Sequence, residues 1–416
     1  MPDWIRIQGI AVAAGLAITA PANAKAGPNE STPESSSPKV EAQAKQIPEK
    51  SPPSSKEPAK KRPLSTRRKA LAVAASIAPG ALVHGAGHFV AGDPTTGFRL
   101  LTMEGVGFGL TAGSLSLLAA TGASRRFTTP LAALTAVGAG LFAISWLADI
   151  YGVAMPEPAR GSPPLGAPFV ETQLGARYVY DPTFAYRMFL VPSIDLRWRS
   201  LRLMPSAWFA TDDVNARLRA LAAYRISGPT PTRSDAREVG APDGSFLDLE
   251  TAVTHHRYGA TQAGALGSVG GFAVTTVEAS LHGRLDAQHI AEPLRGSFIE
   301  LGAGGAVAVH SYPTTTEGNT LLLVRFAYGV YIGRPCAGAP GCSFSSAGEA
   351  KVYYDHRHDD YAAGLKVRGL GSGVPGHFGL TGSLFFTPSW GVSLDAQVGS
   401  AYVAGASLVF RQGGLQ

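Results

Sequence analysis

A repeated period-two alternation of apolar and polar residues constrains this chain most. In residues 319–334 one face is continuously apolar, and the other carries Arg325 among small residues and Tyr331. The apolar face consists of Leu322, Val324, Phe326, Tyr328, Val330 and Ile332. Because side chains of a β-strand point alternately to opposite faces, this segment is predicted to be a strand with one fully apolar side.

The same pattern recurs from residue 168 to residue 416 and predicts about 12 to 13 strands. They are expected at 170–180, 186–198, 201–211, 216–226, 246–258, 272–284, 298–309, 319–334, 347–354, 361–368, 378–386, 391–400 and 402–411. Bacterial single-chain barrels have an even number of strands, and aromatic residues form girdles near their strand ends. We therefore predict an antiparallel transmembrane β-barrel of twelve strands, with a soluble β-sandwich as the alternative.

The amino end predicts export from the cytoplasm. An apolar run at 10–20 is followed by Ala22, Asn23 and Ala24, which fit an A-x-A cleavage site, so residues 1–24 are interpreted as a signal peptide. An uncleaved membrane anchor is the alternative. Cys336 and Cys342 lie in a turn-rich segment, where a disulfide suits an oxidising compartment. The expected location is the cell outer membrane of a Gram-negative bacterium.

Residues 25–68 are rich in Pro, Ser, Glu and Lys and contain almost no large apolar side chain. Such a segment cannot bury enough surface to offset its ordering entropy, so a disordered linker is predicted. The basic cluster at its end, residues 60–69, is either a solvated run or a contact for anionic lipid or cell wall. The net charge of +6 comes without a basic and aromatic patch, so no nucleic-acid partner is expected.

Residues 69–155 are predicted to form a membrane-associated helical bundle. Three Ala- and Gly-rich apolar stretches, at 70–91, 97–121 and 130–153, are each about 20 residues long, enough to cross a hydrocarbon core. With three spans, basic residues before the first and between the second and third would share one side, which the positive-inside rule makes cytoplasmic. A cleaved signal peptide instead places the start of the first stretch in the periplasm, and the two indications conflict.

Part of this block resembles a family of bacterial envelope helical hairpins. The motif runs from Pro79-Gly80 through His84-Gly-Ala-Gly-His88-Phe89, Gly92-Asp93 and Gly97-Phe-Arg-Leu-Leu101 to Glu104. In that family a Pro-Gly opens the first helix and a Gly-rich turn leads to the second. The resemblance covers about 30 residues and implies a paired membrane hairpin without a shared activity.

Charged residues on the polar strand faces are expected to line the barrel lumen. The candidate basic residues are Arg177, Arg187, Arg197, Arg217, Arg219 and Arg325. One interpretation is that they form structural salt bridges with carboxylates in a narrow barrel. The alternatives are an arginine-biased pore that favours anions, or a lumen occupied or capped by the helical block.

Two groups of residues are candidate metal ligands. Asp355, His356, His358 and Asp359 offer nitrogen and oxygen donors between two predicted strands, where a solvated polar turn is the alternative. His84 and His88 share one helix face, with Glu104 and Asp149 within reach from other helices. Hydrogen bonding inside the bundle is the alternative for this second group.

The usual enzyme motifs are missing: there is no G-x-S-x-G elbow, no P-loop and no dinucleotide-binding glycine pattern. We therefore expect a structural barrel or a passive channel without catalysis or cofactor, with membrane lipid and the barrel-assembly machinery as partners. The strand at 402–411 alternates as in the terminal strand that this machinery recognises. The alternatives are an inner-membrane anchor bearing a periplasmic β-domain that binds a partner, and an outer-membrane hydrolase.

Overall fold

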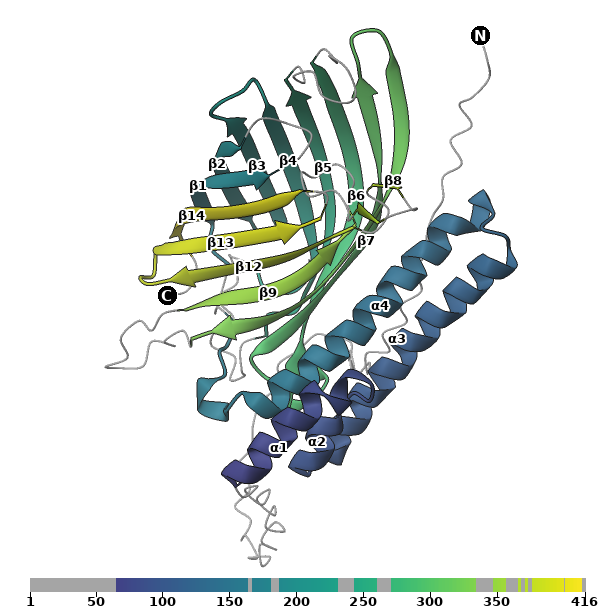
Figure 1. The fold of residues 1–416 in the computed structure, drawn as a ribbon. Coiled ribbons are helices and arrows are strands. Elements are labelled where there is room, and N and C mark those ends of the chain that lie inside the picture. The colour runs from purple at the N-terminus through teal and green to yellow at the C-terminus, as the bar shows by residue number, and fades with distance from the viewer. Residues whose placement is uncertain are drawn as a thin grey trace, which may run out of the picture. The chain divides into compact units, whose positions relative to one another are not determined.

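The computed structural model describes residues 65–163, 167–180, 187–230, 243–259, 271–333, 347–356, 366–367, 371–372, 376–399 and 401–413. Among them, one sheet closes into a barrel in the order β1-β14-β13-β12-β9-β8-β7-β6-β5-β4-β3-β2 (Figure 1). Because each strand pairs with its neighbours in the chain and β1 closes on β14, this is an up-and-down barrel of twelve strands, as predicted. A single closed sheet rules out the soluble sandwich.

The strands of the barrel are long and all neighbours are antiparallel. Their bounds are β1 Val170–Tyr180, β2 Met188–Trp198, β3 Leu201–Ala210, β4 Ala216–Ser227, β5 Phe246–Tyr258, β6 Phe272–Asp286, β7 Ser297–Ser311, β8 Thr316–Ile332, β9 Ala347–Asp355, β12 His377–Phe385, β13 Trp390–Val398 and β14 Tyr402–Gln412. Closure pairs Val170 with Gln412 and Tyr180 with Tyr402.

The strand expected at 361–368 is not part of the barrel in the described residues. Its described portion, β10 (Lys366–Val367), pairs with β11 (Gly371–Ser372) in a separate small sheet. β9 instead pairs directly with β12, from Asp355 opposite His377 to Ala347 opposite Phe385. The thirteenth predicted segment therefore belongs to the connection between two barrel strands.

The outer face of the barrel is apolar along every part of its circumference that the structure describes. Exposed large side chains include Leu174, Leu190, Leu203, Leu218, Leu249, Val277, Val307, Val352, Leu380, Leu394 and Leu408. They come from alternate positions of successive strands, as period-two geometry requires. An apolar band of this kind is what a barrel presents to lipid.

Before the barrel, the chain forms α1 (Thr66–Ile77), a short 3-10 turn η1 (Pro79–Ala81), α2 (Ala86–Ala91), α3 (Pro94–Ala120) and α4 (Arg125–Ala154). The first predicted span, 70–91, is wrong as a continuous helix. Pro79 lacks the N–H that would continue α1, and Gly85 has a positive φ of 88°, which turns the chain before α2.

α3 and α4 are long and apolar enough to cross a membrane, by length and composition. They pack as an antiparallel hairpin at glycines, since a Cβ on Gly107 would lie 2.8 Å from the Gly138 carbonyl oxygen. Arg68 donates to the Val90 carbonyl beside the start of α3, whereas Arg126 lies at the far, connecting end. With two long helices instead of three, the two basic clusters lie at opposite ends of the hairpin.

The hairpin packs on the outside of the barrel. Ile144, Ala148 and Tyr151 of α4 form one apolar core with Ile299 of β7 and Tyr328 of β8. The connection between β6 and β7, which contains η4 (Ala287–His289) and η5 (Glu292–Leu294), completes this core. The hypothesis that the helical block fills the lumen is therefore wrong, because its contacts are with outward-facing strand residues.

Candidate functional site: the barrel interior

The inward faces of the strands carry nearly as many basic as acidic side chains in the described residues. The basic residues are Arg177, Arg197, Arg202, Arg217, Arg219, Arg225, Arg284, Arg325, Lys351 and Arg411, and the acidic residues are Glu171, Asp195, Asp248, Glu250, Glu278, Asp286, Glu300, Glu317, Glu349, Asp355 and Asp395. A lumen of balanced charge lacks the general arginine excess that an anion-selective pore requires.

Ion pairs link neighbouring walls of the interior through two buried glutamates. Glu250 of β5 accepts from Arg325 at 2.5 Å and lies 3.0 Å from Nδ1 of His282. Glu300 of β7 accepts from Arg284 at 2.6 Å and from Lys351 at 2.7 Å. These bonds cross the lumen side of the sheet between strands that are not all neighbours, so they act as cross-braces.

Further contacts extend the network around the wall. Arg219 pairs with Glu278, and Arg177 of β1 pairs with Asp395 of β13 at 3.2 Å. The Arg177 guanidinium also lies 4.3 Å from the ring centre of Trp208, a favourable cation–π distance. Charges taken out of water are stable only when they are paired in this way.

The segment between α4 and β1 crosses the barrel end at which β1 begins. We call it the strap, residues 156–163 and 167–169 in the described chain. α4 ends against β8, which is separated from β1 by β14, β13, β12 and β9 in one direction and by β2 to β7 in the other. The strap therefore connects nearly opposite walls.

Contacts along the strap place it across the interior. The Ser162 N–H donates to the Gly333 carbonyl after β8, and Pro163 lies against Gly244 at the start of β5. Gly244 in turn contacts the hydroxyl of Tyr331, whose side chain points into the lumen. At the other wall the Phe169 N–H donates to Gln412 of β14. Glycine and proline suit this path, because Gly161 is too close to the Tyr331 backbone for any side chain.

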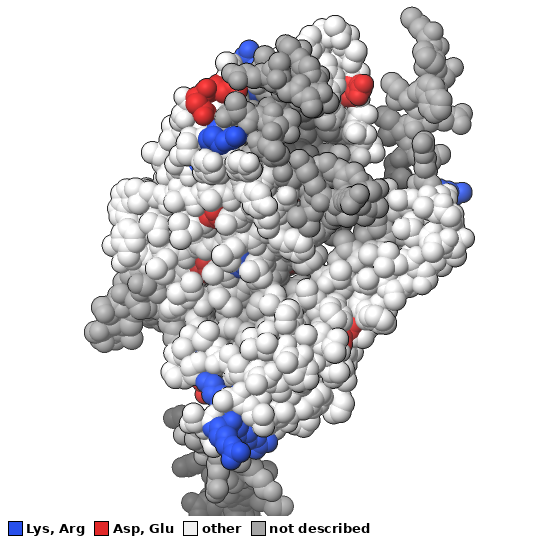
Figure 2. Space-filling view, viewed as in Figure 1, with Lys and Arg blue, Asp and Glu red and all other residues white. Residues whose placement is uncertain are grey.

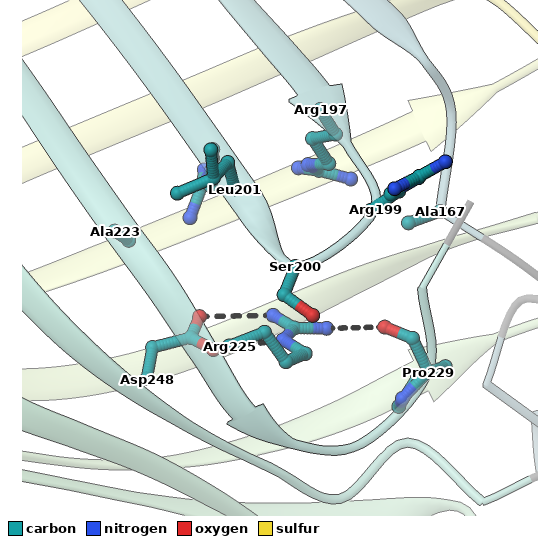
Figure 3. A pocket seen from close by; sticks show the side chains of 10 residues that line it. Ala167, Arg197, Arg199, Ser200, Leu201, Ala223, Arg225, Pro229 and Asp248 are labelled. Atoms are coloured by element: carbon teal, nitrogen blue, oxygen red, sulfur yellow. Dashed lines mark hydrogen bonds and ion pairs between the residues drawn. The ribbon is translucent and has the colours of Figure 1, made fainter. Parts of the chain in front are cut away.

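Beside the strap lies a small pocket lined by Ala167 and residues of β2 to β5. Arg225 is held between the Asp248 carboxylate and the Pro229 carbonyl, with Arg197 and Arg199 across the pocket (Figure 3). Asp195 is not itself part of the lining, but its carboxylate accepts from two lining arginines, Arg197 at 2.6 Å and Arg202 at 2.8 Å.

Of the arginines predicted to line the lumen, Arg177, Arg197, Arg217, Arg219 and Arg325 lie on inward strand faces. Arg187 lies just before β2, with its guanidinium 5.1 Å from the ring centre of Tyr180. Sequence reasoning did not include Arg202, Arg284 or Lys351. Their position in the alternation of the predicted strands would have found all three.

The spacing of His84, His88 and Glu104 has a structural explanation in the helical block. The Asp149 carboxylate of α4 accepts from the backbone N–H groups of Gly85 at 3.0 Å and Gly87 at 3.1 Å, and from Nδ1 of His88 at 2.7 Å. Glu104 of α3 accepts from the His84 backbone N–H at 2.8 Å. Two carboxylates from the long helices thus hold the turn before α2.

Both imidazoles of this turn are fully enclosed. Nδ1 of His84 lies 2.6 Å from Ser145 Oγ, and burial lowers the pKa of His84 against the opposing effect of the Glu104 and Asp149 carboxylates. The alternative of hydrogen bonding within the bundle therefore matches these contacts. The described residues contain no group of three or more His, Cys, Asp or Glu arranged to hold a metal ion.

The second metal candidate is only partly visible. Asp355 ends β9, and Nδ1 of His356 lies 3.0 Å from the Tyr354 hydroxyl. His358 and Asp359 lie outside the described residues, as do Cys336 and Cys342, the signal peptide and nearly all of the linker. The metal sites and the disulfide stay predictions.

No family model matches this chain, and no curated protein matches it. Solved barrels do. The translocator domain of the autotransporter NalP from Neisseria meningitidis is 10% identical over 59% of this chain and 89% of its own, with a TM-score of 0.30. The β domain of the Bordetella autotransporter BrkA is 13% identical over 59% and 99%, with a TM-score of 0.32. The KdgM porin is 7% identical over 57% and 98%, with a TM-score of 0.31. At these scores they carry no argument about function, and the fold rests on the closed strand order.

Proposed function

We propose that this protein is an integral barrel of the Gram-negative outer membrane that is closed at rest and has a structural role. The apolar outer face of the closed sheet carries this proposal, because such a surface is stable only against lipid or another apolar surface. The helical hairpin adds a second membrane-facing element. Its visible surface is almost entirely uncharged between two basic ends (Figure 2).

The closed state follows from what fills the interior. Glu250 and Glu300 are only 5% and 4% exposed as whole residues, although an open water-filled pore would hydrate them. Each is paired with basic side chains, and the strap runs across one end of the lumen. A passive channel is the second candidate, and it would require the strap to move.

The first experiment is membrane fractionation with gel migration before and after boiling. We expect recovery in the outer membrane and a band that shifts only on boiling, since a closed barrel keeps its sheet in detergent at moderate temperature. Recovery in the inner membrane without a shift would favour the anchored periplasmic β-domain instead.

The second experiment measures ion conductance of the purified protein in planar lipid bilayers. We expect no steady conductance from the wild type, and discrete openings from Gly161→Val, whose side chain would collide with the Tyr331 backbone and displace the strap. Gly318→Val is the matched control, because nothing lies within 4 Å of its added Cβ. Steady conductance of the wild type would contradict the closed state and leave the passive channel.

A further inference from the structure

We propose that the pocket beside the strap is a binding site for a small tetrahedral dianion of the phosphate type. Four arginines line it, namely Arg197, Arg199, Arg202 and Arg225, together with a single carboxylate, Asp248. Counting Asp195 behind the lining, the four positive charges face two negative charges. The interior as a whole is balanced, so the positive excess is local to this pocket.

The hydrogen-bonding groups of the pocket are only partly used. Each of the three Arg225 nitrogens donates once, to the Asp248 carboxylate or to the Pro229 carbonyl. Arg202 uses Nε and Nη2 on Asp195, and Arg197 uses Nη2 on the same carboxylate. Within the described chain, Arg199 makes no ion pair with a carboxylate. Its guanidinium lies 5.4 Å from the Trp198 ring centre. The unused donors of three guanidinium groups remain for a ligand.

The backbone at Arg199 supplies an independent argument. Arg199 has a positive φ of 52° in the tight turn between β2 and β3, a conformation that favours glycine. Of the described residues that are not glycine, one other, Ala123, has a positive φ. Arg199 lies on the pocket lining with its guanidinium beside the Trp198 ring, and backbone strain of this kind is commonly kept at ligand sites.

The chemistry of the lining selects the ligand class. Guanidinium groups match the oxygens of phosphate and carboxylate in pairs, and a dianion balances the local charge excess. The pocket is small and open on one side, which leaves no room for a large solute. Because the pocket opens inside the barrel end beside the strap, the ligand must come from the aqueous phase on that side.

This inference does not depend on the membrane in which the barrel resides. It is tested by titrating inorganic phosphate into the folded, detergent-solubilised full-length protein in a calorimeter, with chloride at equal ionic strength as reference. Vesicles containing anionic phospholipid form a separate arm that distinguishes a lipid headgroup from the free anion. Fractionation, which tests the proposed function, is read independently.

The decisive variant is Arg199→Gly, which removes the guanidinium and relieves the positive φ, so the fold is retained. We expect saturable phosphate binding by the wild type and a loss of about tenfold to a hundredfold in the variant, the effect of removing hydrogen bonds to a charged group. Arg295→Ala, a half-exposed arginine in the β6–β7 connection, is the matched control and should bind as the wild type does.

Any one of the following results would overturn the site. They are absence of saturable phosphate binding, equal binding by Arg199→Gly and the wild type, or an equal loss in Arg295→Ala, which would indicate general attraction to basic residues. Binding only to vesicles would also overturn it, since it would assign the anion to lipid.

Discussion

Replacing Asp149 by alanine should release the turn before α2 while leaving the barrel intact. The carboxylate accepts hydrogen bonds from the backbone N–H groups of Gly85, Gly87 and His88 and from the His88 imidazole. Each buried donor left without a partner costs about 1–3 kcal/mol. Because four losses at one site are not additive, we expect about 3–5 kcal/mol, as for other broken buried pairs.

The assay follows two signals during heating in detergent. The helical circular dichroism should be lost at lower temperature in Asp149→Ala, whereas the gel shift that marks barrel unfolding should keep its midpoint. The barrel is independent because its ladder closes from β1 to β14 without a contribution from the helices. Asp149→Asn keeps one acceptor oxygen, so the temperature at which its helical signal is lost should lie between those of the wild type and Asp149→Ala.

Asp93→Ala serves as the matched control. Asp93 caps α3 from a partly exposed position by accepting from Thr96, and loss of such a cap costs about 0.5–2 kcal/mol. Equal destabilisation by Asp149→Ala and Asp93→Ala would refute the view that Asp149 holds the turn. A barrel midpoint that falls together with the helical signal would refute the independence of the two parts.

Three further predictions concern the packing, the interior and the pH response. Gly140→Leu should weaken hairpin docking by about 1–3 kcal/mol in thermal melts, because an added Cβ would lie 2.7 Å from the Phe326 ring, whereas Gly109→Leu, with open space around it, should have no effect. Glu300→Ala should lower the midpoint of the boiling shift, at a cost of up to about 3–5 kcal/mol, because Lys351 loses its carboxylate and Arg284 keeps only Glu349; an unchanged midpoint would contradict the bracing role. Burial lowers the pKa of His84, so the unfolded chain binds the proton more readily. Stability is therefore complete above about pH 6.5 and falls on acidification below it, a dependence that should be absent from His84→Asn.

The barrel was predictable because strand alternation is a local property. The alternation within residues 319–334 assigns each side chain to one of two faces without knowledge of the neighbouring strands. The inward position of the arginines follows from the same alternation. The thirteenth strand was wrong because an apolar run at 361–368 does not reveal whether a neighbour has room to pair with it. Strand number thus followed from the evenness rule and not from the pattern alone.

The structures of the helical block and the strap were harder to predict from the sequence. The hydropathy pattern shows that residues 70–91 are apolar. It does not show that Gly85 turns the chain or that the Asp149 carboxylate accepts a hydrogen bond from the Gly85 N–H. The strap depends on which strand α4 packs against, and this contact joins residues far apart in the sequence. The arginine pocket is formed by four neighbouring strands together, so its local charge excess exists only after β2 to β5 have paired.

The outward hairpin and the strap together have a consequence for how the barrel closes. The hairpin is next to β1 in the chain, yet it rests on β7 and β8 in the middle of the sheet. Once β7 and β8 have formed, α4 can dock on them. The strap then keeps the start of β1 within a short distance of its final position. The last pairing, β1 with β14, then becomes a search within a small volume instead of a meeting of two distant chain ends, and its entropy cost falls accordingly. The hairpin would in this way act as a built-in assembly guide for its own barrel.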